Sequence, residues 1–141
     1  MQEQNFEDVI DRIIAKDPRY RRGAYYFLRE ALDFTQRKVA QGKKQGLRHV
    51  SGQELLDGIR EFGGAQFGPM ALTVLEEWGV RRGEDFGEIV FNLVASGQLS
   101  KTDKDNRDDF KGGYNFDDAF RKPFLPKAKL GLLAAKPGSP S

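Results

Sequence analysis

The chain has 141 residues, 38% of them hydrophobic and 31% charged, with a formal net charge of +2, and this length suits one domain with its own core. Because it contains no cysteine, disulfides, thiolate zinc sites, cysteine-ligated iron–sulfur clusters and cysteine nucleophiles are excluded. No apolar run approaches the length of a membrane-spanning helix, and residues 1–12 lack the basic and apolar regions of a signal peptide, so we expect a cytoplasmic protein without a membrane partner.

Two helices are predicted near the amino-terminal end. The first covers residues 5–16, with Asn5 as its N-cap, and stops at the Asp-Pro pair that follows. The second begins near Gly23. The apolar residues on the inner faces of the two helices are Phe6, Val9, Ile10, Ile13 and Ile14, and then Ala24, Phe27, Leu28, Ala31, Leu32, Thr35 and Val39. Both faces must be covered, so we expect the pair to pack on later helices. Residues 40–50 indicate an exposed linker, rich in glycine and positive charge.

Residues 50–99 hold the clearest helix signals. Ser51 and Glu54 have the spacing of a capping box, in which the serine oxygen accepts from the third helical amide and the glutamate reaches back to the cap amide. The helix that starts here carries apolar residues at spacings of three and four. We expect Gly63 and Gly64 to end it.

Two more helices are predicted in the same stretch. One covers residues 69–79, with Trp78 in the core, and the other covers residues 85–97. A strand at 98–101 and a returning strand at 114–116, where aromatic residues alternate, would form a hairpin after the third helix. Three helices followed by a hairpin resemble a winged helix.

The predicted fold is therefore mainly α. Two N-terminal helices pack on a three-helix unit with a C-terminal β-hairpin, in a winged-helix-like domain that covers residues 1–124. A plain helical bundle, with a polar loop in place of the wing, is the alternative. Residues 125–141 are a basic tail, whose last five residues we expect to be disordered.

The sequence contains no specific catalytic, cofactor or metal signature. His49 is the single histidine and belongs to the basic linker, where an exposed role is more typical than a catalytic one. An aspartate cluster suggests calcium, but Arg107 stands where an EF-hand loop needs an oxygen ligand; the cluster is Asp103, Asp105, Asp108 and Asp109. The glycines lack the lysine and hydroxyl residue of a P-loop. We expect no catalytic residue, no cofactor and no metal.

Charge is distributed unevenly along the chain. Residues 51–100 carry eight acidic and three basic residues, whereas both flanks are basic. The last of the three helices predicted in residues 50–99 would enter DNA in a winged helix, yet Glu84, Asp85 and Glu88 lie in its first turns and residues 84–97 contain no cation, which argues against base readout. RNA or DNA, bound weakly and without sequence specificity, would instead contact basic residues of the amino-terminal flank: Arg19, Arg21, Arg22, Lys43, Lys44 and Arg48.

Most of the chain also lies in three longer segments: DPRYRRGAYYFLREALDFTQ, RHVSGQELLDGIREFGGAQFGPMALTVLEEWGVRRGEDFGEIVFNLV and DDFKGGYNFDDAFRKPF. Together they resemble a small bacterial protein family of uncharacterised function. The resemblance covers residues 6–124. It implies a bacterial cytoplasmic setting and brings no assigned activity, so no site residue is carried over from it.

Three functional hypotheses follow. The first is a non-enzymatic binding module for protein interaction or regulation, whose acidic face and basic flanks contact different partners. The second is a nucleic-acid or ribosome-associated protein that binds through the basic flanks. The third is an enzyme without a recognised motif. We expect the partner to be another protein, and none of these features fixes the oligomeric state.

Overall fold

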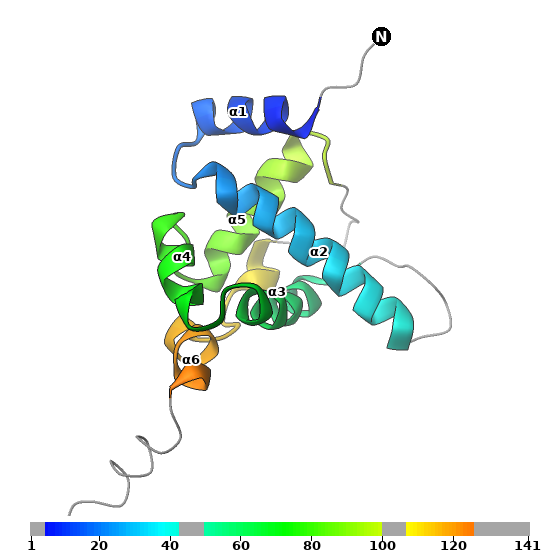
Figure 1. Cartoon of the computed structure of the whole chain (residues 1–141). Helices are drawn as coiled ribbons and strands as arrows, with labels where there is room; N and C mark the ends of the chain where they lie inside the picture. The colour runs from blue at the N-terminus through cyan, green and yellow to red at the C-terminus, as the bar shows by residue number, and fades with distance from the viewer. Residues whose placement is uncertain (1–4, 43–49, 100–106, 126–141) are drawn as a thin grey trace, which may run out of the picture.

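The computed structural model describes residues 5–42, 50–99 and 107–125, and within these ranges the chain is helical, without a strand (Figure 1). The α-helices are α1 (Phe6–Lys16), α2 (Arg22–Gly42), α3 (Gly52–Phe67), α4 (Ala71–Glu77), α5 (Gly83–Ala95) and α6 (Phe116–Phe120), and the short 3-10 helices are η1 (Gly68–Met70), η2 (Arg107–Phe110) and η3 (Lys122–Phe124). In Figure 1, α1 lies across the top, α5 passes behind α2, and α3 and α4 lie below α2 with α6 at their foot. None of the described helices is long and apolar enough to cross a membrane.

The two amino-terminal helices form as predicted. Asn5 caps α1, because its Oδ1 accepts a hydrogen bond from the amide of Asp8 at 2.8 Å. Helix α2 extends into the predicted linker and ends at Gly42. The rest of that linker, residues 43–49, lies outside the described residues.

The capping box of α3 is confirmed. Ser51 Oγ accepts from the amide of Glu54 at 3.1 Å, and Glu54 Oε1 accepts from the amide of Ser51 at 3.0 Å. The predicted end of this helix is wrong, since α3 continues through Gly63 and Gly64 to Phe67. The chain turns at Gly68, whose φ of 53° is a conformation that favours glycine.

Gly63 and Gly64 make room for aromatic side chains. A Cβ on Gly63 would lie 3.3 Å from the rings of Phe27 and Phe120, and one on Gly64 would lie 3.3 Å from the ring of Phe124. Their role is therefore close packing inside a helix, and the helix pays only a modest intrinsic cost for them. They also bring η3 against the last turns of α3.

The described helices share one hydrophobic core. Each α-helix contributes a fully or almost fully buried side chain to it: Ile10 from α1, Tyr25 from α2, Leu56 from α3, Leu75 from α4, Phe86 from α5 and Phe120 from α6. The two amino-terminal helices therefore pack on the later helices, as their apolar faces predict. Helices α2 and α3 approach most closely at Gly58, where an added Cβ would lie 2.8 Å from the Cβ of Thr35.

The predicted β-hairpin and winged helix are wrong. After α5 the described chain resumes in η2, residues 100–106 being outside the described residues, and the expected returning strand is the start of α6. Asn115 caps α6, with Oδ1 accepting from the amides of Asp117 and Asp118 at 2.8 and 3.2 Å. The ring of Phe116 contacts that of Phe120 at 5.0 Å between centroids, so these aromatic residues follow a helical repeat. The architecture agrees with the helical alternative.

Candidate interaction surface

Two of the six basic residues predicted to meet an anionic partner, Arg19 and Arg22, are ion-paired within the fold. Arg19 Nη2 lies 2.7 Å from a carboxylate oxygen of Asp17 and 3.2 Å from one of Glu88, and Arg22 Nη1 lies 2.6 Å from Asp11 Oδ1. Among the described residues, the side chain of Arg21 has no polar partner. The remaining members of the predicted set, Lys43, Lys44 and Arg48, lie outside the described residues.

Arg19 belongs to a polar network that ties the α1–α2 loop to α5. Asn92 Nδ2 donates to Asp17 Oδ2 at 3.1 Å, and the Tyr20 hydroxyl donates to Asp85 Oδ1 at 2.6 Å. The hydrogen bond from Arg19 holds the pKa of Asp17 well below its ordinary value, while burial and the bond to Asp85 raise the pKa of Tyr20. Carboxylates of the first turns of α5 therefore serve packing within the chain.

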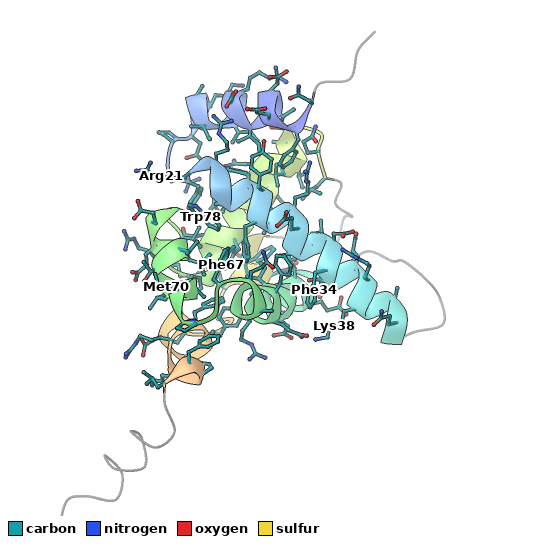
Figure 2. The ribbon with its side chains drawn as sticks, viewed as in Figure 1. Arg21, Phe34, Lys38, Phe67, Met70 and Trp78 are labelled. Atoms are coloured by element: carbon teal, nitrogen blue, oxygen red, sulfur yellow. The ribbon has the colours of Figure 1, made fainter. Side chains whose placement is uncertain are left out.

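A second feature is a row of partly exposed apolar side chains on α2, α3, η1 and the end of α4. We call it the aromatic row; its members are Phe34, Phe62, Phe67, Met70 and Trp78. Met70 is 55% exposed, and no other large hydrophobic side chain in the described ranges is classed as exposed. Figure 2 shows the row from Trp78 through Phe67 to Phe34, with Met70 below it.

The rings of the row form two contacting pairs. The centroid of Phe62 lies 5.4 Å from that of Phe34, and the centroid of Phe67 lies 5.7 Å from that of Trp78. Phe27, which is only 3% exposed, lies beneath them and contacts Phe62, Phe67 and Trp78 at 5.6 to 5.7 Å. The row is thus the partly exposed side of a packed aromatic cluster, and Phe27 supports it from the side of the core.

Trp78 is fixed at one end of the row. Its carbonyl accepts a hydrogen bond from the amide of Arg21 at 3.0 Å, which joins the end of α4 to the start of α2. The indole lies against the backbone of α2, since a Cβ on Gly23 would lie 2.8 Å from its Cζ2. Trp78 therefore packs against the core but is only partly buried, whereas the sequence predicts it in the core.

Charged groups flank the row. Arg21 lies at the Trp78 end and Lys38, ion-paired with Glu61, lies near Phe34 (Figure 2). From α3 to α4 the chain has five acidic side chains and one basic one, namely Glu54, Asp57, Glu61, Glu76 and Glu77 against Arg60. An open groove of about 620 Å³ adjoins the row at Phe62 and is lined on its other side by charged residues of α2. The surroundings of the row are therefore polar and carry charges of both signs.

The sequence interpretation did not find this surface. Phe34 falls outside the inward face assigned to its helix, and Phe67 lies beyond Gly63 and Gly64, where the sequence predicts that the helix ends. A signal was present in the density of large apolar residues between Phe62 and Met70. That density of apolar residues identifies a surface only when α2 and α4 are known to pack against α3 there.

The described residues contain no cluster of three or more histidine, cysteine, aspartate or glutamate side chains placed to hold a metal ion. Of the predicted aspartate cluster, Asp108 pairs with Lys111 at 3.0 Å, while Asp103 and Asp105 lie outside the described ranges. The resemblance to a small bacterial family stays a prediction. No protein-family model matches the chain, and no curated protein sequence or solved structure is similar to it.

Proposed function

We propose that this chain is a non-enzymatic protein-interaction module, which binds an apolar segment of a partner protein along the aromatic row. The observation that carries the proposal is the exposure of Met70, three residues after Phe67, together with four half-buried aromatic rings that the buried Phe27 joins into one cluster. Contiguous exposed apolar surface with a polar rim is typical of interaction sites. Aromatic residues and methionine are also enriched in interfaces, where methionine adapts to different shapes.

The chemistry of the row favours binding over catalysis. Its members are aromatic rings and a thioether, which supply contact area and no acid, base or nucleophile. Fully burying a methionine side chain stabilises a complex by roughly 1.5–3 kcal/mol relative to leaving it exposed. Met70 is about half exposed, so its burial would contribute roughly half of that, on the order of a tenfold change in affinity.

The charges around the row favour a protein over a nucleic acid. Affinity for nucleic acid is dominated by neutralisation of phosphates. Lys38 is paired with Glu61, and Arg19 and Arg22 are paired with carboxylates, so much of the positive charge near the row and in the adjoining loop is already neutralised. We further propose that the interaction takes place in the bacterial cytoplasm, the setting that the family resemblance favours.

Site-specific photo-crosslinking tests the proposal. A photoreactive phenylalanine analogue is placed at Met70, at Phe67 and, as a matched control, at Ala15, an exposed residue of α1, a helix that contributes no residue to the row. The proposal predicts that one protein crosslinks from both row positions but not from Ala15, and that nuclease treatment leaves the product intact. Equal products from all three positions, or crosslinks from the row that are lost on nuclease treatment, would contradict it.

A further inference from the structure

We propose that the aromatic row binds the chain's own carboxyl-terminal segment, residues 127–136, KAKLGLLAAK. This inference rests on the proposed function and names a segment that would occupy the same surface before a partner protein binds. The segment lies outside the described residues, and its sequence, its charge and the position of its attachment point carry the argument.

The composition of the segment matches the surface. It contains three leucines, Leu130, Leu132 and Leu133, within four positions, and three lysines, Lys127, Lys129 and Lys136, with no acidic residue. Leucine side chains gain free energy when they leave water for an apolar surface. The aromatic row offers such a surface in the described part of the same chain.

The segment is positively charged, and carboxylates lie beside one end of the row. The segment carries three lysines and no acidic residue. Glu76 and Glu77 are exposed on α4 immediately before Trp78. Charges closer than about 10 Å attract one another effectively at moderate ionic strength, so the lysines favour binding beside these carboxylates.

The attachment point brings the segment close to the row. The ring of Phe124 packs against α3, 3.3 Å from where a Cβ of Gly64 would lie, and Phe67 follows Gly64 by three residues, about 4.5 Å along the helix axis. From Leu125 to Leu130 the chain spans at most about 18 Å when extended. Figure 1 shows the described chain ending at α6, at the foot of α3 and α4. The leucines can therefore reach Phe67 and Met70 without any rearrangement of the helices.

Binding of its own segment would make the surface a regulated one. A tethered segment acts at an effective concentration on the order of millimolar, so even weak contacts occupy the surface for most of the time. A partner protein must then displace the segment. The affinity for the partner falls by the fraction of molecules whose row is free, about tenfold if one molecule in ten is free.

Trp78 gives a direct test, because it is the single tryptophan and lies in the row. Emission wavelength and acrylamide quenching are compared for three full-length proteins. They are the wild type, a variant with Leu130→Ser, Leu132→Ser and Leu133→Ser, and a control with Pro137→Ser and Pro140→Ser outside the segment. We expect red-shifted emission and a larger quenching constant in the leucine variant alone, both restored by adding a synthetic peptide of residues 127–136.

Two results would contradict the proposal. If the wild-type quenching constant changes on dilution, the occupant is a second copy of the chain and the intramolecular proposal is wrong. If the leucine variant matches the wild type and the peptide has no effect, the segment does not bind the row. The crosslinking from Met70 tests the proposed function independently of the segment. A partner crosslink that is specific to the row supports the proposed function, whereas the absence of such a crosslink contradicts it too.

Discussion

Replacing Gly58 with alanine tests the packing on which the aromatic row depends. Gly58 lies where α3 crosses α2, and an alanine Cβ would overlap Thr35 Oγ1 and lie 2.8 Å from Thr35 Cβ. Thr35 cannot move aside easily, because it is 2% exposed and its hydroxyl donates to the carbonyl of Ala31 at 2.7 Å. Overpacking of a core costs about 1–3 kcal/mol, while alanine in place of glycine stabilises a helix by roughly 1 kcal/mol.

The overlap here involves two heavy atoms of a buried β-branched residue, which places the cost at the upper end of that range. We therefore expect Gly58→Ala to lower the free energy of unfolding by about 2 kcal/mol after the helix gain is subtracted. Urea denaturation, with the slope held common, measures this difference. Gly64→Ala is the matched control on the same helix. Its nearest contact is 3.3 Å from the ring of Phe124, and its cost should be smaller.

Adding Thr35→Ala to Gly58→Ala should recover part of the lost stability, since it removes the overlapping hydroxyl. Such a double-mutant cycle isolates the contact between the two helices. A Gly58→Ala protein as stable as the wild type, or one that Thr35→Ala fails to rescue, would refute the close crossing of α2 and α3.

Three other perturbations have defined outcomes. Ser51→Ala should lower the free energy of unfolding by about 1 kcal/mol through loss of the capping box, and an unchanged thermal melt would contradict that cap. Because Arg19 lowers the pKa of folded Asp17, the stability difference between wild type and Asp17→Asn should be full near neutral pH and shrink as the pH falls below about 4; urea melts across that range check the trend. Trp78→Ala should cost about 3 kcal/mol, the lower end of the range for a core aromatic, because the residue is only partly buried; a cost below about 1 kcal/mol, measured by urea denaturation, would contradict its contacts with Phe27 and Phe67.

The parts of the fold that depend on neighbouring residues could be predicted from the sequence. The capping box at Ser51 and Glu54 uses groups three residues apart, and the apolar face of α1 repeats within a few turns. Both signals are complete within a short window. For this reason the starts of α1 and α3, and the inward faces of both, agree with the structure.

The predictions are wrong where residues far away in the sequence determine the local structure. Gly63 and Gly64 are typical of a helix end, yet α3 continues through them. The rings of Phe120 and Phe124 pack against these glycines, in the space that larger side chains would need. The aromatic residues around Tyr114 alternate as in a strand, but the Tyr114 hydroxyl donates to the carbonyl of Leu56 at 2.7 Å and the following residues form α6. In both cases the partner is more than fifty residues away in the sequence.

The candidate surface could not be predicted for the same reason, because it depends on residues that are distant in the sequence. Arg19 and Arg22 looked available for an anionic partner because Glu88 and Asp11, which pair with them, belong to other helices. The aromatic row was not predicted because Phe34 and Phe62 come together only through the crossing of α2 and α3. The position of the row follows from the packing of α2, α3 and α4, which no short stretch of the sequence contains.

The most direct test of the central claim is the dissociation constant of the crosslinked partner, once purified, for the wild type, Met70→Asp and the control Ala15→Asp. Met70 is exposed, so its substitution leaves the core intact, which circular dichroism can verify. The account predicts that a carboxylate in the row weakens binding by about tenfold or more, while Ala15→Asp has little effect. Equal dissociation constants for the two variants would contradict the claim that this surface binds the partner.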